Sequence, residues 1–179
     1  MAGYCWRCGT GLPTEPPITC PACGQSHHLN PKPCAEAVVL CGSQVLLMRR
    51  AKDPWRGAWE VPGGFCELAE HPAAAAEREL GEELGLAGRV IAFIGSWMDA
   101  YESPGRDQAG EHTLNCAYLV ELDDPGAAPV LEADEVLEAR WFDLTTLPEP
   151  LAFPNHMGAV LAAAARLDAD NLPPMLDIG

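Results

Sequence analysis

Basic residues are scarce in this chain. Its 179 residues include 11 Lys and Arg against 26 Asp and Glu, which gives a formal net charge of −15 at pH 7. Non-specific binding to nucleic acids depends on cations that neutralise phosphates. The composition therefore argues against a nucleic-acid partner, and if the substrate is an anion, metal ions must mediate its approach.

Long apolar segments are absent as well. No apolar run approaches the roughly twenty residues that a membrane-spanning helix needs. The first residues, MAGYCWRCG, lack the basic patch and following apolar stretch of a secretory signal peptide. We therefore expect no association with membranes and a cytoplasmic location.

Four cysteines gather near the N-terminus. They follow the pattern C-x2-C-x11-C-x2-C, and a glycine follows each pair. Two such pairs can place four thiolates tetrahedrally around one zinc ion, and a closed set of four makes that zinc structural. A redox motif would need one pair only, and a disulfide framework is typical of secreted chains. We predict a zinc ribbon with the ligands Cys5, Cys8, Cys20 and Cys23.

The segment NPKP (30–33) indicates a hinge, so we predict a zinc ribbon over residues 1–33 and a second domain over 34–179. Strands interleaved with two helices predict an α/β (α+β) fold in which helices cover a mixed sheet. The first two strands are expected to form a hairpin across the turn CGS. The expected strands are 34–40, 44–50, 89–97, 113–122 and 137–144, and the expected helices are 72–84 and 156–167.

The first predicted helix concentrates negative charge. Glu79, Glu82 and Glu83 fall on one face at spacings i, i+3 and i+4, where like charges repel. A solvated acidic face is one interpretation. A site for a hard divalent cation, Mg2+ or Mn2+, is the other. Gly63 and Gly64 favour the metal site, because glycine lets the backbone approach a metal or a phosphate closely. The apolar stripe of the same helix is expected to be Ala73, Ala76, Leu80 and Leu84.

One motif spans residues 64–86 and includes these glutamates. The pattern G-x5-E-x7-R-E-U-x-E-E-x-G-U, in which U is aliphatic, is matched without a mismatch. This is the Nudix box, and the chain resembles the Nudix family. A zinc ribbon before such a box is similar to the NADH pyrophosphatase branch of that family. The matching residues are Gly64, Glu70, Arg78, Glu79, Leu80, Glu82, Glu83, Gly85 and Leu86.

The resemblance implies a Nudix-type mixed β-sheet sandwiched between helices. It also implies metal-dependent hydrolysis of the pyrophosphate bond in a nucleoside diphosphate linked to another moiety. Arg78 is expected to pair with Glu70, and Gly85 to end the helix in a left-handed conformation. The expected ligands of Mg2+ or Mn2+ are Glu79, Glu82, Glu83 and the carbonyl of Gly63.

A carboxylate must accept the proton of the attacking water. Glu82 is one candidate, and the segment LEADEVLEARW offers four more, of which we favour Glu135. The alternative for each of these loop acids is a solvated side chain. The four loop candidates are Glu132, Asp134, Glu135 and Glu138.

Substrate contacts are expected from two kinds of side chain. Arg49 or Arg50 at the end of the hairpin is expected to contact phosphate, with a solvated charge as the alternative. Trp97 or Tyr101 is expected to stack on a base, with a place in the core as the alternative. Trp141, inside a predicted strand, is expected in the core. The polar segment 103–112 is expected to form a loop near the substrate.

The preferred substrate is expected to be ADP-ribose or a similar compound. The NADH pyrophosphatase branch carries the signature Ser-Gln-Pro-Trp-Pro-Phe-Pro after its box, and residues 92–110 contain nothing like it. An NADH/NAD pyrophosphatase is the alternative within the family.

A non-catalytic regulator that senses a nucleotide, or that binds nucleic acid through the zinc ribbon, is the alternative of another class. The intact glutamates argue against it, as does a ribbon segment with only Arg7 and Lys32 as basic residues. Homodimers are frequent among relatives, so a homodimer is a further expectation.

Overall fold

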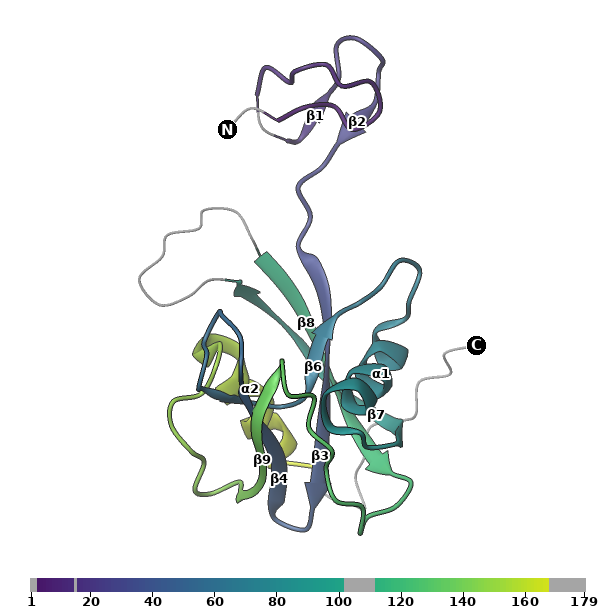
Figure 1. The fold of residues 1–179 in the computed structure, drawn as a ribbon. Helices are drawn as coiled ribbons and strands as arrows, with labels where there is room; N and C mark the ends of the chain where they lie inside the picture. The colour runs from purple at the N-terminus through teal and green to yellow at the C-terminus, as the bar shows by residue number, and fades with distance from the viewer. Residues whose placement is uncertain (1–2, 15, 102–111, 168–179) are drawn as a thin grey trace. The chain divides into compact units, whose positions relative to one another are not determined.

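The computed structural model describes residues 3–14, 16–101 and 112–167. The chain divides into two compact units, Met1–Pro31 and Lys32–Gly179. Figure 1 shows both units as a ribbon.

The smaller unit is built around its four cysteines. Strands β1 (Ile18–Thr19) and β2 (Ser26–His27) pair antiparallel. The sulfur of Cys5 lies 3.6 Å from that of Cys23, the sulfur of Cys8 lies 3.8 Å from that of Cys20, and all four lie within 4.8 Å of one another. Tetrahedral zinc with Zn–S bonds of about 2.3 Å separates its sulfurs by roughly 3.8 Å. The cluster therefore fits the predicted zinc ribbon.

A glycine after each cysteine pair turns the chain back toward the cluster. Gly9 and Gly24 have φ angles of 73° and 72°, which residues with a side chain adopt at a cost. The N–H of Gly9 donates to the carbonyl of Cys5 at 2.8 Å, and that of Gly24 donates to the carbonyl of Cys20 at 2.9 Å. The two turns have the same geometry, which explains why glycine follows both pairs.

The larger unit contains one seven-stranded mixed sheet (Figure 1). Its main path runs β5-β4-β3-β8-β7, while β6 pairs with β3 and β9 pairs with β4. The central pair β3 and β8 is parallel, and the other pairs are antiparallel. The strands are β3 (Lys32–Cys41), β4 (Gln44–Arg50), β5 (Trp59–Glu60), β6 (Gly63–Phe65), β7 (Gly88–Ala100), β8 (His112–Leu122) and β9 (Val136–Asp143).

The predicted hairpin is confirmed. Cys41 pairs with Gln44, so Gly42 and Ser43 form a two-residue turn between β3 and β4. Gly42 has a φ of 58°, the positive value that tight hairpin turns require and glycine supplies.

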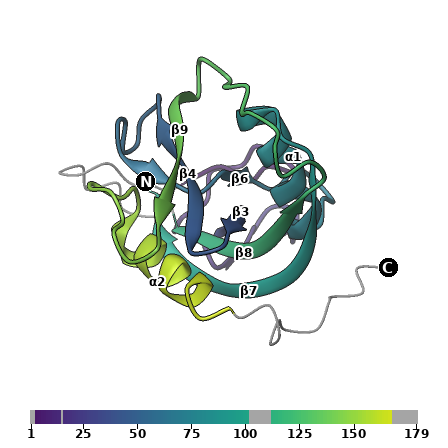
Figure 2. The ribbon, with the colours of Figure 1, turned by 90° about the horizontal axis from the view of Figure 1, so that it is seen from below.

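Two helices cover opposite faces of the sheet, which confirms the predicted layered fold (Figure 2). Helix α1 (Pro72–Leu84) packs on one face and α2 (Pro154–Ala164) on the other. Successive side chains of a strand point to opposite faces. In β3, Val39 accordingly joins the core beneath α1, and Val38 joins the core beneath α2.

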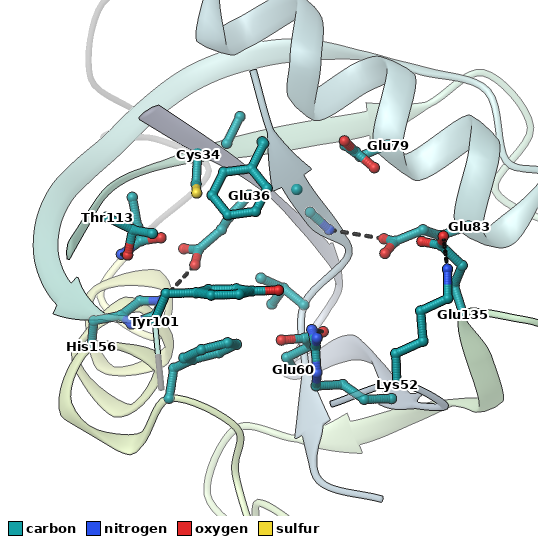
Figure 3. Close-up of a pocket in the computed structure, with 18 of the residues that line it drawn as sticks. Cys34, Glu36, Lys52, Glu60, Glu79, Glu83, Tyr101, Thr113, Glu135 and His156 are labelled. Carbon is teal, nitrogen blue, oxygen red and sulfur yellow. Dashed lines mark hydrogen bonds and ion pairs between the residues drawn. The ribbon is translucent and has the colours of Figure 1, made fainter. Parts of the chain in front are cut away.

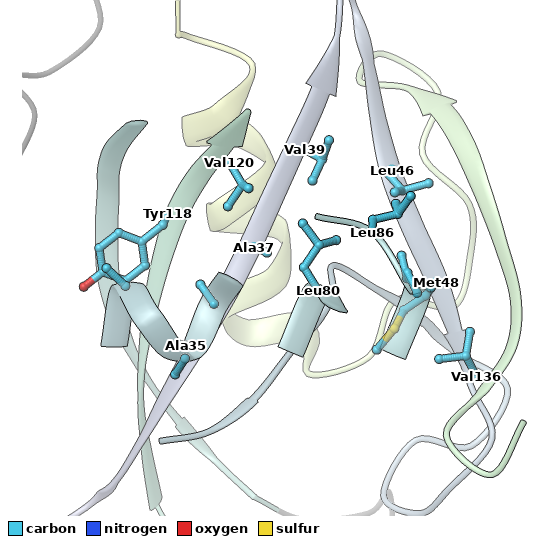
Figure 4. Close-up of a cluster of buried hydrophobic side chains, with 14 residues drawn as sticks. Ala35, Ala37, Val39, Leu46, Met48, Leu80, Leu86, Tyr118, Val120 and Val136 are labelled. Carbon is cyan, nitrogen blue, oxygen red and sulfur yellow. The ribbon is translucent and has the colours of Figure 1, made fainter. Parts of the chain in front are cut away.

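The core beneath α1 combines side chains from α1 and from the strands β3, β4, β8 and β9 (Figure 4). Small alanines of β3 let the helix approach the sheet, and Leu80 fills the space between β3 and β4. The predicted apolar stripe is confirmed, because each of its members is fully buried: Ala73, Ala76, Leu80 and Leu84.

The C-terminal end of α1 is fixed by a neighbouring loop. Gly85 ends the helix with a φ of 62°, as predicted. The carbonyls of the last turn have no partner within a helix. Here the N–H of Val130 donates to the carbonyl of Leu84 at 2.7 Å, and the N–H of Glu132 donates to that of Glu83 at 2.9 Å. The loop before β9 is thereby tied to the helix that carries the predicted metal ligands.

One prediction is wrong, and another concerns residues that lie almost wholly outside the described ones. Trp141 is 36% exposed, so its assignment to the core is wrong. Its neighbour Phe142 faces the core beneath α2 in its place, with its ring 4.8 Å from that of Trp59. The predicted loop at 103–112 lies outside the described residues except for its last one.

None of the helices in the described part of the chain has the length and apolar composition of a membrane-spanning segment.

Zinc analysis tests the ribbon. Protein purified without added zinc should contain about one zinc ion per chain, because four thiolates close the coordination sphere. Replacing Cys20 and Cys23 by serine should abolish that zinc and lower the melting temperature. Cys41→Ser removes an exposed thiol outside the cluster and should leave the zinc content unchanged. Native protein without zinc would contradict the ribbon.

Candidate active site

A cavity of about 430 Å³ lies in the larger unit (Figure 3). Its volume is within the range of sites for small molecules. Carboxylates of α1 border one end of it, Glu36 and His156 border the other, and the ring of Tyr101 lies between the two ends (Figure 3). Helix, sheet and loop residues that are distant in sequence thus meet around one space.

Glu83 is the most enclosed of the three box glutamates. It is 4% exposed, and its Oε2 accepts the N–H of Gly63 at 2.9 Å. Burial raises its pKa to about 9, and the negative charges of Glu60, Glu79 and Glu135 act in the same direction. A divalent cation bound here would offset this accumulation of negative charge.

Glu79 borders the same end of the cavity, in contact with a glycine. Burial raises the pKa of Glu79 above its ordinary value, against the influence of Arg78. A Cβ added to Gly64 would lie 2.3 Å from Glu79 Oε1, and one added to Gly63 would lie 2.4 Å from the carbonyl oxygen of Ala35. Both glycines are therefore explained by close contacts with neighbouring protein atoms.

Arg78 joins the box loop to the helix. Its Nε and Nη2 donate to Glu70 Oε1 and Oε2 at 2.8 Å and 2.9 Å, which confirms the predicted pair. These bonds, followed by the N–H of Glu67, lower the pKa of Glu70 to about 2. Nη2 also donates to the carbonyl of Phe65 at 3.1 Å. The loop from Phe65 to Glu70 is consequently fixed against α1.

Glu82 has a different environment from Glu79 and Glu83. Its side chain is 60% exposed, it does not line the cavity, and its Oε2 lies 2.8 Å from Arg78 Nη1. Arg78 Nη1 also donates to Glu79 Oε1 at 2.8 Å. Arg78 thus holds both Glu79 and Glu82, whereas the N–H of Gly63 holds Glu83. Among the described residues, only the four cysteines form a group of three or more ligand atoms within 4.8 Å of one another.

Glu135 is the one loop candidate for the general base that lines the cavity. Its carboxylate forms an ion pair with Lys52, and its carbonyl accepts the N–H of Ala51 at 2.7 Å. The cavity lining does not include the other three candidates, Glu132, Asp134 and Glu138.

The two predicted arginines have different positions. Arg50 lines the cavity, forms an ion pair with the buried Glu60, and donates from Nε to the carbonyl of Pro54 at 2.7 Å. Arg49 lies outside the cavity lining, with its Nε 3.6 Å from Glu138 Oε2. Lys52, which the sequence analysis missed, lines the cavity together with Arg50 and Arg78. As one of only two lysines in the chain, it was detectable by its scarcity.

The two predicted aromatic residues differ in the same way. Tyr101 lines the cavity and stacks on Phe153, with ring centroids 5.8 Å apart and an interplanar angle of 21°. Trp97 packs against the core beneath α2 and does not line the cavity.

A buried group that the sequence analysis missed borders the far end of the cavity. His156 Nε2 lies 2.5 Å from Glu36 Oε1, and His156 Nδ1 lies 2.7 Å from Asp99 Oδ2. A lone glutamate in the apolar run CAEAVVL was a usable signal, since a charged side chain is rarely buried without a partner. Asp99 and His156 carried no comparable signal.

Comparison with known proteins assigns the family. The NUDIX domain profile matches residues 31–163. The chain belongs to the Nudix hydrolase family. It is 32% identical over 129 residues to the ADP-ribose pyrophosphatase of Methanocaldococcus jannaschii, which covers 72% of this chain and 71% of that protein. The Nudix hydrolase structure from Nitrosomonas europaea covers 97% of this chain and 96% of its own, with a TM-score of 0.68 and 24% identity.

A second group of relatives of this Nudix hydrolase carries a different name. The NAD-capped RNA hydrolase NudC of Pseudomonas aeruginosa is 28% identical over 148 residues, which is 81% of this chain. The match covers 49% of that protein, so this chain spans about half of its length.

Glu83 gives this Nudix hydrolase a pH-dependent stability. Without divalent cations its folded-state pKa is about 9, against an ordinary value of 4.5. The folded state then holds the proton more tightly, so the free energy of unfolding falls as pH rises from about 4.5 to about 9. Glu83→Gln removes this loss. Its melting temperature without divalent cations should exceed that of wild type at pH 8 and approach it at pH 5.

The matched control is Glu121→Gln, which changes an exposed carboxylate paired with Arg89. It should show no such crossover between pH 5 and pH 8. Mg2+ should raise the melting temperature of wild type at pH 8 more than that of Glu83→Gln. A wild type more stable than Glu83→Gln at pH 8 without divalent cations would contradict the raised pKa.

Proposed function

We propose that this Nudix hydrolase cleaves the pyrophosphate bond of a nucleoside diphosphate linked to another moiety, with ADP-ribose or a similar compound preferred. The observation that carries the proposal is the arrangement of one cavity. Glu79 and Glu83 border one end, Arg50 and Lys52 supply positive charge, and Tyr101 offers an aromatic surface. The 32% identity to an ADP-ribose pyrophosphatase supports the choice of substrate.

The box end of the cavity is the proposed site of Mg2+ or Mn2+. Carboxylate and carbonyl oxygens suit both ions. Burial raises the pKa of Glu79 and of Glu83, and a nearby cation would favour their charged forms. A bound divalent cation would neutralise phosphate charge and lower the pKa of a water. The proposed ligands are Glu79, Glu83 and the Gly63 carbonyl, with Glu82 at the exposed edge.

Glu135 is the proposed general base. Its carboxylate borders the cavity and is paired with Lys52, which fixes its position. In the proposed reaction it accepts the proton of the water that attacks the pyrophosphate. Glu82 is the second candidate, but its exposed side chain faces Arg78.

Arg50 and Lys52 are the proposed partners of the substrate phosphates. Arg50 is already oriented by Glu60 and by the carbonyl of Pro54, so it loses little freedom when it binds a phosphate. Arg49 is less suited, because it lies outside the cavity lining. Tyr101, and not Trp97, is the proposed surface for the base.

An NADH/NAD pyrophosphatase is the second candidate. The similarity to a protein named NAD-capped RNA hydrolase NudC favours it, and the absent signature after the box argues against it. We propose small nucleotides, and not RNA, as substrates because the chain has 26 acidic and only 11 basic residues. A role as a nucleotide-sensing regulator and assembly into a homodimer are further predictions that await a test.

Removal of the Glu83 charge should abolish most activity. Glu83→Gln keeps the shape of the side chain and can still accept the N–H of Gly63, but it removes a charged ligand. Turnover at saturating Mg2+ should fall by about two orders of magnitude or more, with the fold retained. Glu121→Gln should keep wild-type turnover. Near wild-type turnover of Glu83→Gln would eliminate the metal assignment.

A comparison of substrates tests the preference. We expect kcat/KM for ADP-ribose to equal or exceed the values for NADH, FAD and nucleoside triphosphates under one metal condition. AMP should be one product, since attack falls on the pyrophosphate. A preference for NADH of more than about tenfold, or roughly 1.4 kcal/mol in transition-state binding, would reverse the order of the two candidates.

A further inference from the structure

Glu36 is a buried carboxylate with one oxygen unused. It lies in β3 between two alanines and is 6% exposed. Its Oε1 is 2.5 Å from His156 Nε2, whereas Oε2 is buried and has no hydrogen-bond partner among the described residues. A buried acceptor left without a donor destabilises the fold. Because Glu36 also lines the cavity, a bound ligand can supply the missing donor.

Hydrogen bonds to His156, and through it to Asp99, fix the orientation of the Glu36 side chain. His156 connects it to Asp99 through hydrogen bonds at both ring nitrogens. Asp99 also accepts the N–H of Ala100 at 2.7 Å and Asn155 Nδ2 at 3.2 Å. Burial lowers the pKa of His156, but Glu36 and Asp99 outweigh it and raise that pKa. His156 can therefore donate to both carboxylates, which leaves Glu36 Oε2 without a donor among the described residues.

The polar neighbours of Glu36 at this end are already engaged. Asn115 Nδ2 donates to Thr113 Oγ1 at 3.0 Å and to the carbonyl of Trp97 at 3.4 Å. The hydroxyl of Thr113 donates to the carbonyl of Asp99 at 3.5 Å. Neither side chain gives a hydrogen bond to Oε2. The free acceptor is thus a feature of the cavity wall, opposite the end with Glu79 and Glu83 (Figure 3).

Aromatic rings border the same part of the cavity. Tyr101 stacks on Phe153 and contacts Phe65, with ring centroids 5.8 Å and 5.2 Å apart. All three line the cavity. Such surfaces suit planar ligands, which gain from stacked or edge contacts. A planar ring with an N–H group at its edge could pack against the aromatic rings and donate a hydrogen bond to Glu36 Oε2.

We propose that Glu36 Oε2 accepts a hydrogen bond from the exocyclic amino group of a purine base that packs against Tyr101. Glu36 is then a specificity-determining residue for 6-aminopurine nucleotides, and His156 and Asp99 are the residues that position it. The inference rests on the proposed function for the direction of the substrate, with its pyrophosphate at the Glu79 and Glu83 end. A hydrogen bond to an ionised acceptor is among the stronger ones in proteins.

The test compares ADP-ribose with the analogue whose base is unsubstituted purine, which lacks only the 6-amino group. For wild type, kcat/KM should fall about tenfold or more, because a site that loses its donor leaves a buried acceptor unpaired. For Glu36→Gln the two substrates should differ by less than about threefold, since the side-chain amide would direct its own N–H groups at the cavity.

The matched control is Glu67→Gln, which changes another carboxylate of the cavity lining, an exposed one. It should keep the discrimination of wild type. If Glu36→Gln does not fold, Glu36→Asp withdraws the carboxylate by one methylene and should lose the discrimination in the same way. Wild type with less than threefold discrimination, or a Glu36 variant that keeps tenfold, would overturn the inference. The inference would also be overturned if kcat/KM fell on removal of a ribose hydroxyl but not on removal of the amino group.

Calorimetric binding of the same two ligands separates the inference from the proposed function. Discrimination in binding without any hydrolysis would refute the proposed function and keep the role of Glu36. Hydrolysis of ADP-ribose and of the purine analogue with equal kcat/KM would support the proposed function and refute the role of Glu36.

Discussion

One guanidinium holds the box loop and the box helix together. Arg78 contacts both oxygens of Glu70, the carbonyl of Phe65, and the carboxylates of Glu79 and Glu82. Gly63 and Gly64 precede this loop in β6, where they pair with β3, and the N–H of Gly63 donates to Glu83. A planar group with five donors in a fixed geometry is suited to such a role, and a lysine is not.

The cavity combines strong negative charge with few cations. Each cation that lines it is paired with a carboxylate: Arg50 with Glu60, Lys52 with Glu135, and Arg78 with the box glutamates. An anionic substrate therefore meets no unpaired cation among the described residues that line the cavity. The proposed divalent cation would supply the positive charge that this lining lacks, which agrees with the expectation drawn from the net charge of the chain.

The sequence predicted most of the layered fold because its signals are local. Gly42 marks a tight turn, Leu80 belongs to a stripe with helical period, and Gly85 marks a helix end. The pair of Arg78 and Glu70 followed from the box. The cluster of Glu36, Asp99 and His156 could not be predicted, because it joins three distant elements through tertiary contacts. The exposure of Trp141 was missed because periodicity alone does not show how completely a sheet face is covered.

The hydrogen bonds from Val130 and Glu132 to the last carbonyls of α1 have a mechanical consequence. They tie the loop before β9 to the end of the helix, so that hydrogen bonds connect the segments of Glu83 and Glu135, which are 52 positions apart in sequence. Changes of length in the segment 123–129 would be absorbed before Val130 and would leave the two carboxylates in register. The same change between Glu132 and Glu135 would shift one carboxylate against the other, so the freedom of this loop to vary ends at Val130.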